Sequence, residues 1–597
     1  MFSFKNIFHI TPPRESIQNK DIHKVFKLPI NYLDKTQVFK LSKNVTDDLE
    51  LSTPQSEDIS GNEQEGLTMY EHILKPTNAF SKSLIPEWSK HFTNDISFLT
   101  ESQDVIRNVD YVLKEQQSVD CSKMISLWQD TKQDRNFVDK YSFIEWDIGK
   151  HLNSSSGFLQ TMSFINMASP VLSFFIPIFF LIFPFLILKI QGIPIDVATY
   201  VNTLKNIAKN HFIGMIIKNA QTMNLTSLAY IIMLGGLYFL QIYQNYRACL
   251  RFYNNLNKIN DHLTNLKDYL DTTINHMTAF TEVNADFSTY SNFCTESTKH
   301  IVVLQQLREE LDSITHIKPT FSKITEIGYL LKCFYKIHDD DDYENAIRYS
   351  IGFEGYISCI KGIRENMLDN NIAMSSFTTD SDTTINNMCY PALVNKNPVL
   401  NNCDLKKNAI ITGPNASGKT TMLKSMALNV IFSQQFGCGF YESSCVSPYT
   451  HIHSYLNIPD TSQRDSLFQA ESRRCKEILD IIDTNDTDTR HLCIFDELYS
   501  GTNPEEAIKS AHAFLLYLSK KQNVDFMLTT HYVSLCKKIK KTPNFKNYKM
   551  DVTIKGDMID KYTFKMTNGI SKVKGGVAIL EEMNYPKEII NNIHNSK

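Results

Sequence analysis

The segment NAIITGPNASGKTT, residues 408–421, joins a short apolar run to a loop that contains two glycines. Apolar residues then recur at helical spacing, at Met422, Leu423, Met426, Ala427, Val430 and Ile431. The segment therefore predicts a buried strand, a loop and a helix in direct succession. Residues 413–420 also fit the pattern G-x-x-x-x-G-K-[ST], whose glycines let backbone N–H groups surround a phosphate at the N-terminus of the helix. We expect a nucleotide-binding α/β domain around this loop.

The side chains of this loop are expected to bind ATP and Mg²⁺. Lys419 should reach the β- and γ-phosphates and take part in catalysis, and Thr420 should supply a hydroxyl to Mg²⁺. The residues expected to bind the nucleotide are Gly413, Pro414, Asn415, Ala416, Ser417, Gly418, Lys419, Thr420 and Thr421.

Two further strands are predicted to end at the same site. The run HLCIFDE, His491 to Glu497, is apolar until it ends in two carboxylates. Asp496 is placed to hold Mg²⁺, directly or through water, and Glu497 to orient and deprotonate the attacking water. The run DFMLTT, Asp525 to Thr530, is followed by His531, whose imidazole is expected to sense or polarise the γ-phosphate. Together these catalytic groups predict hydrolysis of ATP to ADP and phosphate.

Length and composition limit the other possibilities. A chain of 597 residues is expected to form about three to five domains. With 42% hydrophobic and 21% charged residues it can bury cores, which excludes a disordered, collagen-like or low-complexity protein. The net charge of -4 is not that of a strongly basic nucleic-acid binder, so any DNA contact must be local. The 12 cysteines include no CxxC pair and are expected to be reduced, and the N-terminus carries no secretory signal.

Two uncharged segments predict a membrane hairpin. No Asp, Glu, Lys or Arg lies between Lys150 and Lys189, and residues 167–188 are apolar enough to cross a hydrocarbon core. A second uncharged run is centred on residues 225–246 and ends in tyrosines. Prolines spaced seven residues apart favour a kinked or re-entrant first segment. The alternative is a pair of buried core helices.

The expected architecture is a multi-domain α and α/β protein. We predict a mostly helical region at residues 1–150, the transmembrane hairpin within 151–250, a helical core or lever at 251–385 and a P-loop, ABC-like ATPase domain at 386–597. An even number of spans would keep both flanking halves in one ATP-containing compartment, such as the cytosol; the alternative is a soluble intracellular protein. The run Asp339 to Asp342 is expected to be a solvated loop without function.

From about Tyr390 to the C-terminus the sequence resembles the ATPase domain of the MutS family. ITGPNASGKTT is similar to the phosphate loop of the family, CIFDELYSGTNPEE to its Walker B segment, and TTHY to its histidine switch. RDSLFQAESRR, at residues 464–474, resembles the family segment whose serine, here Ser466, reaches the nucleotide of the partner subunit. The tail at residues 562–590 resembles a helix-turn-helix dimerisation element. The resemblance implies a homodimer with composite ATP sites that clamps duplex DNA and switches with ATP.

The sequence also departs from this family. Mismatch-reading members carry a Phe-x-Glu wedge, and the first 140 residues contain no such triplet. The triplets at residues 143–145 and 280–282 are interpreted as chance matches. The apolar hairpin is foreign to the soluble repair proteins, although residues 45–51 and the first apolar segment resemble a MutS-related branch that carries such an insertion. An ABC transporter ATPase is disfavoured because no LSGGQ-like segment lies between the two nucleotide motifs.

Two functions therefore remain open. The first is a MutS-type ATPase that couples its nucleotide state to the binding of mismatched or structured duplex DNA. The second is a membrane-anchored, ATP-driven switch that acts on a protein or on the bilayer. A basic cluster at Lys537, Lys538, Lys540 and Lys541 could contact DNA phosphates, but a lysine cluster on an exposed helix more often serves only solubility and does not establish nucleic-acid binding.

Overall fold

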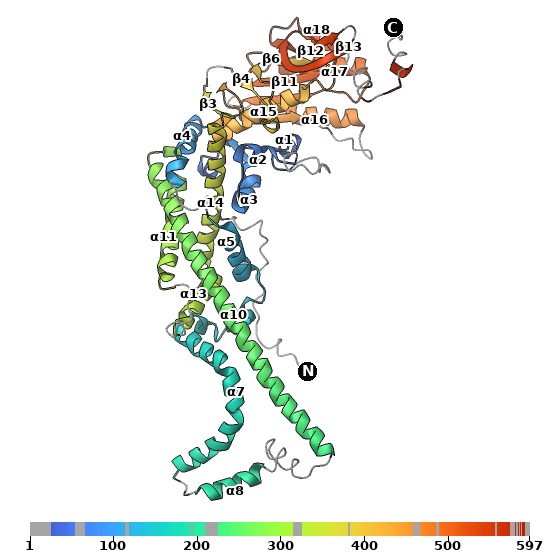
Figure 1. The fold of residues 1–597 in the computed structure, drawn as a ribbon. Helices are drawn as coiled ribbons and strands as arrows, with labels where there is room; N and C mark the ends of the chain where they lie inside the picture. The colour runs from blue at the N-terminus through green and yellow to red at the C-terminus, as the bar shows by residue number, and fades with distance from the viewer. Residues whose placement is uncertain are drawn as a thin grey trace. The chain divides into compact units, whose positions relative to one another are not determined.

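The computed structural model forms two compact units (Figure 1). Unit 1 comprises Met1–Asp21, Val119–Thr272 and Val303–Ala346, and unit 2 comprises Ile22–Ser118, Thr273–Val302 and Ile347–Lys597. The residues that the structure describes are 25–53, 66–113, 119–192, 194, 196–208, 225–314, 325–379, 382–456, 458, 466–484, 489–555, 558–573, 580, 583, 585–586 and 588–590. The described part of unit 1 is helical, whereas unit 2 combines helices with sheets, in agreement with the predicted mixture of α and α/β structure.

Unit 1 is built around part of a long helix, α10 (Leu225–Val283). Apolar residues at three- and four-residue spacing along this helix are all buried, at Leu256, Ile259, Leu263, Leu266 and Leu270. The other elements are α5 (Cys121–Trp128), η4 (Gln129–Gln133), α6 (Phe137–Lys140), η5 (Lys150–Ser154), α7 (Ser156–Ile190), α8 (Val197–Ala208), α13 (Ile327–Asp339) and parts of α11 (Ser291–Glu310) and α14 (Asp341–Leu368). The π-helical turn η4 contacts α10 through a polar pair: the carboxylate of Asp130 in η4 lies 2.7 Å from Nε2 of His262 in α10.

The two segments predicted to form a membrane hairpin are helices, α7 and the first part of α10. They pack side by side, since the Tyr238 hydroxyl donates to the Phe174 carbonyl oxygen at 2.9 Å. Many apolar side chains here are exposed; Val171 is 60% exposed and Phe239 68%. Within the described residues, no helix has both the length and the apolar character that a membrane span requires. The predicted transmembrane hairpin is therefore not supported.

The aspartate run at residues 339–342 is helical rather than a loop. Only Asp340 lies outside a helix, because α13 ends at Asp339 and α14 begins at Asp341. Its Oδ1 accepts hydrogen bonds from the backbone N–H groups of Asp342, at 3.0 Å, and Tyr343, at 3.3 Å. The prediction of a loop was wrong because carboxylates are favoured at a helix N-terminus, where they accept capping hydrogen bonds and interact favourably with the helix dipole.

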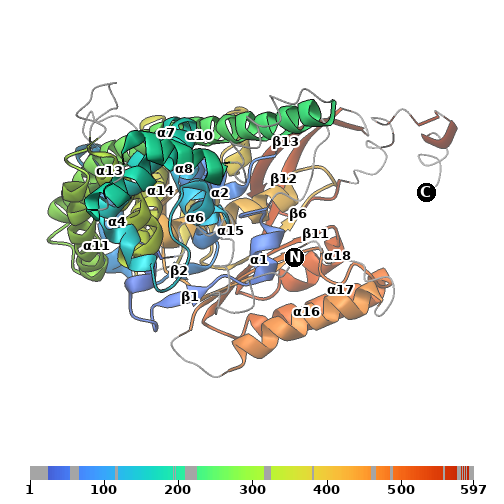
Figure 2. The ribbon, with the colours of Figure 1, turned by 90° about the horizontal axis from the view of Figure 1, so that it is seen from below.

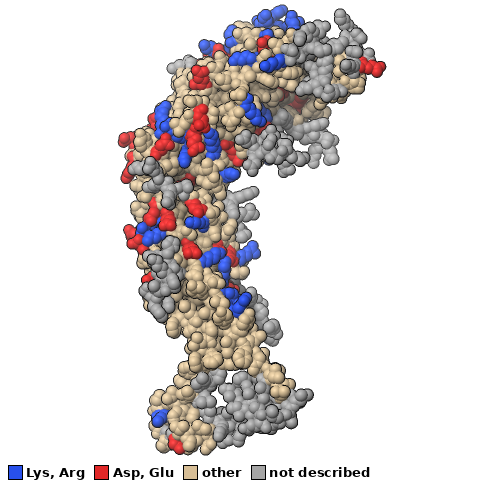
Figure 3. All heavy atoms as spheres, viewed as in Figure 1, with Lys and Arg blue, Asp and Glu red and all other residues tan. Residues whose placement is uncertain are grey.

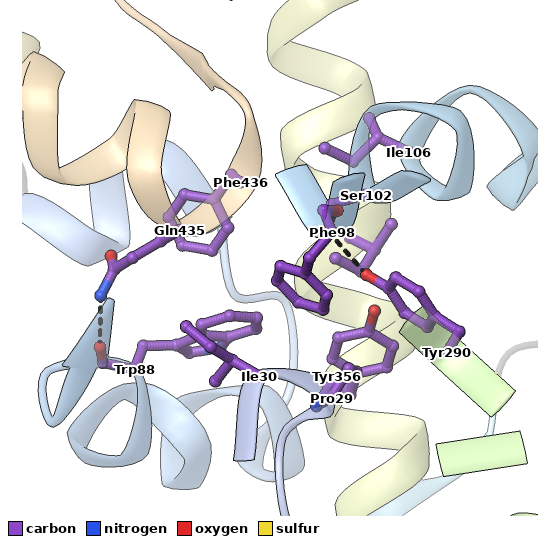
Figure 4. Close-up of a pocket in the computed structure, with 11 residues that line it drawn as sticks. Pro29, Ile30, Trp88, Phe98, Ser102, Ile106, Tyr290, Tyr356, Gln435 and Phe436 are labelled. Atoms are coloured by element: carbon purple, nitrogen blue, oxygen red, sulfur yellow. Dashed lines mark hydrogen bonds between the residues drawn. The ribbon is translucent and has the colours of Figure 1, made fainter. Parts of the chain in front are cut away.

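The helical part of unit 2 contains η3 (Pro29–Tyr32), α1 (Lys43–Asp48), α2 (Met69–Leu74), α3 (Ala79–Trp88), α4 (Ile96–Leu113), η6 (Ser288–Tyr290) and the remainders of α10, α11 and α14. The strands β1 (Val38–Lys40) and β2 (His91–Thr93) pair in an antiparallel sheet. Aromatic rings close the space between these helices (Figure 4): Trp88 packs against Phe436 with ring centroids 4.8 Å apart, and Phe98 stacks on Tyr290 at 5.3 Å. The cavity left between them is only about 10 Å³, which is room for roughly one water molecule.

A six-stranded sheet carries the predicted motifs. Its order is β13 (Met558–Asn568), β12 (Phe545–Lys555), β6 (Asn408–Thr412), β11 (Val524–Thr530), β10 (His491–Asp496) and β9 (His451–Tyr455). All neighbours are parallel except β12 and β13. The three strands predicted around the nucleotide site are thus central and adjacent. Because parallel strands end at the same edge, their C-terminal residues come together there.

Helices cover both faces of this sheet (Figure 2). The helices α16 (Leu467–Ile482), α17 (Pro504–Leu518) and α18 (Val533–Ile539) pack on one face around Phe495, Phe526 and Leu528. The helix α15 (Lys419–Phe436) contacts β10 and β11 from the other side. A second sheet adjoins it in the order β5 (Asn401–Asp404), β4 (Thr384–Met388), β8 (Ser443–Val446), β3 (Ala373–Phe377) and β7 (Cys438–Gly439), with η7 (Pro391–Leu393) after β4.

Candidate functional site

A cavity of about 780 Å³ opens beyond the C-terminal ends of β6 and β10. One wall is the phosphate loop with the first turns of α15, and the floor carries Asp496 and Glu497. The opposite wall is mainly apolar and comes from residues 388–401, together with Met550 and Phe564 from the β12–β13 pair. A cavity with one polar and one apolar wall has the dimensions and chemistry of a nucleotide site.

The loop at residues 413–418 has the backbone form that its sequence predicts. Ala416 and Gly418 have positive φ angles, of 61° and 89°. A Cβ atom at Gly413 would lie 2.7 Å from the Ser417 Oγ atom, so the loop is too tight for a side chain there. Among the residues that the structure describes, no side chain caps the N-terminus of α15. Its first N–H groups are therefore free of a capping partner and available to an anion.

Lys419 is the first residue of α15, and its side chain folds back over the loop. Its Nζ atom donates to the carbonyl oxygens of Gly413 and Pro414, both at 3.2 Å, and lies 3.8 Å from the Glu497 carboxylate. The residue is only 6% exposed. A buried ammonium group interacts more favourably with an anionic phosphate than with neutral carbonyl oxygens. This position therefore fits the role predicted for Lys419.

The Asp496 carboxylate is held by two threonine hydroxyls. Thr420 donates to Oδ2 at 2.7 Å, and Thr529 donates to Oδ1. Thr420 is on α15 and Thr529 on β11, so the contacts join three elements that are distant in sequence. A hydroxyl and a carboxylate oxygen side by side at the edge of a phosphate-sized space are the ligands that Mg²⁺ takes in such sites. The residues present therefore fit the predicted metal site.

Glu497 lies between the imidazole of His531 and the ammonium group of Lys419. Its carboxylate is 3.5 Å from Nδ1 of His531 and 3.8 Å from Nζ of Lys419. The neighbouring imidazole is the main reason why the pKa of Glu497 lies below its ordinary value of 4.5; partial burial opposes this shift and Lys419 supports it. Glu497 also has a positive φ of 52°, a strained conformation that points to a functional turn. An ionised carboxylate in this position can accept a proton from water.

Ser466 lies away from these groups. It is the exposed N-cap of α16, its Oγ accepts a hydrogen bond from the Gln469 N–H at 3.3 Å, and it does not line the cavity. The structure of a single chain thus brings together every predicted site residue of the loop, β10 and β11, but not Ser466. In the predicted helix-turn-helix tail, residues 562–568 form the end of strand β13 rather than a helix, so this part of the prediction is wrong. Residues 574–579 of the tail, and the first two residues of the Ser466 segment, 464 and 465, lie outside the described residues.

Two parts of the site were not predicted. Thr529 belongs to the TTHY segment, but only the parallel register that places Asp496 opposite Thr529 shows its contact. The apolar wall, with Tyr390, Leu393 and Phe564, comes from segments before and after the motifs. No periodicity in the sequence marks these residues as a group.

The basic cluster at Lys537, Lys538, Lys540 and Lys541 is solvent-exposed on and just after α18. Figure 3 shows basic side chains over the part of unit 2 that carries α18 and β12, with acidic ones among them. The four lysines do not line the cavity. Their position permits contact with a polyanion but does not identify one.

Comparison with known proteins places this site in context. Residues 409–597 match the family model described as MutS domain V. Endonuclease MutS2 of Streptococcus agalactiae is 30% identical over 195 residues, which is 32% of this chain and 24% of the relative. Endonuclease MutS2 of Streptococcus mutans is 30% identical over 186 residues, 30% of this chain and 23% of the relative. DNA mismatch repair protein MutS of Caldicellulosiruptor saccharolyticus is 28% identical over 290 residues, 48% of this chain and 30% of the relative.

The chain thus spans less than a third of the length of each of these relatives. The matched region includes the phosphate loop and the two carboxylates, which line the cavity, and His531, which contacts Glu497; the cavity wall from residues 388–401 lies before the matched region. The resemblance predicted from these motifs is confirmed for this region. Residues 409–597 are similar in sequence to MutS domain V.

Proposed function

We propose that the α/β part of unit 2, from about residue 386, binds ATP with Mg²⁺ and hydrolyses it. One observation carries the proposal: the open N-terminus of α15, the Thr420–Asp496 pair and the Glu497 carboxylate all border one cavity of about 780 Å³. Each is the type of group that a triphosphate, a divalent cation and an attacking water require. The match to MutS domain V supports the same activity.

In this proposal each side chain has one task. Lys419 exchanges its loop carbonyls for the β- and γ-phosphate oxygens. Glu497 accepts a proton from a water molecule while the water oxygen attacks the γ-phosphorus, and the bond to the ADP oxygen breaks. His531 donates a hydrogen bond to the γ-phosphate. Mg²⁺, held by Thr420 and Asp496, supplies charge neutralisation at the phosphates.

The ATPase is best tested by substitution of the two groups with separate tasks. Lys419→Ala should abolish nucleotide binding, whereas Glu497→Gln should bind ATP and fail to hydrolyse it. Lys407→Ala is a matched control, because Lys407 is exposed just before β6 and does not line the cavity. Equal hydrolysis by wild type and Glu497→Gln would reject the assignment of the base.

We further propose that the nucleotide state controls binding of duplex DNA by a homodimer with composite sites. The relatives named DNA mismatch repair protein MutS and Endonuclease MutS2 support this substrate class. The exposed position of Ser466 is compatible with a contact to the nucleotide of a second copy. Preference for mismatched or structured duplexes is the finer part of the proposal. Its test is binding to matched and mismatched duplexes over a salt series, with ADP and with a non-hydrolysable ATP analogue.

A second candidate is an ATP-driven switch that acts on a protein partner. The exposed apolar side chains of α7 and α10, such as Phe179 at 61% and Phe239 at 68%, favour it, since contiguous apolar surface is typical of binding surfaces. The same experiment separates the two candidates. Nucleotide-dependent DNA binding supports the first, and no DNA binding at any salt concentration supports the second.

A further inference from the structure

A buried carboxylate on α16 holds the turn that follows the catalytic strand. Glu471 is only 2% exposed. Its Oε1 accepts a hydrogen bond from the Ser500 hydroxyl at 2.9 Å, and its Oε2 accepts one from the Gly501 N–H at 3.2 Å. A buried carboxylate is costly unless hydrogen bonds replace its lost water. Here both oxygens are used, and both face the turn at residues 497–501.

This turn is under strain and is held from several sides. Glu497 and Tyr499 both have positive φ angles, of 52° and 58°. The Tyr499 N–H donates to the Tyr455 hydroxyl at 3.2 Å. Strained backbone of this kind persists only where the surroundings determine it. The position of the Glu497 carboxylate therefore depends on the contacts that fix the turn.

The turn also lies directly against the first turn of α16. A Cβ atom added to Gly501 would lie 2.7 Å from Cγ of Leu467 and 2.9 Å from the backbone nitrogen of Phe468. The rings of Phe468 and Tyr499 are 5.7 Å apart. No gap separates the two elements, so a shift of the α16 N-terminus displaces residues 499–501. Ser466, the predicted contact with a second copy, is the N-cap of this same helix.

We propose that Glu471 is a positioning residue that fixes Glu497 through the turn at residues 497–501 and couples it to the N-terminus of α16. The proposal rests on the ATPase function proposed above. Glu471 does not line the cavity, so it acts on the geometry of hydrolysis and not on nucleotide binding. A contact made by a second copy at Ser466 would reach the catalytic carboxylate by this route.

The test uses the full chain and two substitutions of Glu471. Glu471→Leu keeps the size of the side chain but removes both acceptors, whereas Glu471→Gln can accept from Gly501 and donate to Ser500. We expect Glu471→Leu to lower kcat at least tenfold while the Kd for Mg-ADP stays within about twofold, and Glu471→Gln to restore most of kcat. Glu477→Leu, at an exposed position of the same helix, should match wild type.

Two outcomes overturn the proposal. The first is an unchanged kcat in folded Glu471→Leu, and the second is a parallel loss of kcat and nucleotide binding. If Glu471→Leu does not fold, Gly501→Ala tests the same coupling, because its methyl group pushes the turn away from Leu467; unchanged kcat there also overturns the proposal. Failure of the ATPase function itself is distinguishable, since wild type would then show no hydrolysis.

Discussion

The contact between Thr529 and Asp496 allows a quantitative prediction. Thr529 is fully buried on β11, and its hydroxyl donates to Oδ1 of Asp496 while Thr420 donates to Oδ2. Thr529→Val keeps the shape of the side chain and leaves one carboxylate oxygen without its donor. The Thr529 hydroxyl orients the carboxylate that would hold Mg²⁺, and loss of such an outer-shell partner typically lowers metal affinity by about 10- to 100-fold. The Mg²⁺ concentration for half-maximal hydrolysis should therefore rise by about 10- to 100-fold.

The assay is hydrolysis of ATP as a function of Mg²⁺ concentration, with nucleotide binding in EDTA as a second readout. Binding without Mg²⁺ should be unchanged, because Thr529 does not line the cavity. Thr530→Val is the matched control. Thr530 is buried on the same strand, but its hydroxyl accepts a hydrogen bond from the Tyr532 N–H at 3.0 Å and does not contact Asp496. The same Mg²⁺ dependence in both variants would refute the assignment of Thr529.

Three further predictions concern the base, the dimer and the core. The pKa of Glu497 lies below its ordinary 4.5, so the carboxylate stays ionised as pH falls from neutrality, and the rate should drop only when pH passes through that lowered pKa; a pH–rate profile of the wild type checks this, and an acidic limb above pH 4.5 would contradict it. Ser466→Ala should impair hydrolysis. A mixture of the Ser466→Ala and Lys419→Ala proteins should recover activity in a steady-state assay, because a mixed dimer has one site with both residues intact. Turnover by a strict monomer would reject the composite site. Phe495→Ala, at a fully buried position of β10, should lower the free energy of unfolding by about 3–5 kcal/mol in chemical denaturation; a loss below about 1 kcal/mol would contradict its place in the core.

The nucleotide loop could be read from the sequence because its chemistry is local. The glycines, Lys419 and Thr420 follow one another, and the α15 helix that they begin shows its own apolar periodicity. Asp496 and Glu497 could be found because a buried parallel strand is a continuous apolar run with polar residues at its end. Patterns of this kind need no knowledge of which strands are neighbours.

Contacts set by long-range register could not be predicted in the same way. The pairing of Asp496 with Thr529 depends on the parallel alignment of β10 and β11. The hydrogen bond from the Gly501 N–H to Glu471 joins residues 30 positions apart. The membrane hairpin was predicted from composition alone, and the described helices do not meet the requirement for a span. Hydropathy shows that a segment is apolar enough to be buried. Which surface it packs against depends on its contacts with the rest of the chain.

The helix α15 links the nucleotide cavity to the helices of unit 2. Its first turn borders the cavity, and nearly all of its residues down to Phe436 are buried. At the far end, Gln434 donates to the Thr93 and Tyr449 carbonyl oxygens, at 2.9 and 2.8 Å. Gln435 donates to the Trp88 and His91 carbonyl oxygens, at 2.8 and 2.7 Å (Figure 4 shows the bond to Trp88).

These four bonds are buried or nearly so, and breaking any of them would leave a polar group without water. A continuous helix of 18 residues does not shorten when its first turn moves. A ligand that displaces the phosphate loop must therefore either bend α15 or carry β2 and the end of α3 with it. If α15 stays straight, the cavity beside Phe436, which holds only about one water, leaves little free space to absorb the movement, and the helices around Trp88 move as well.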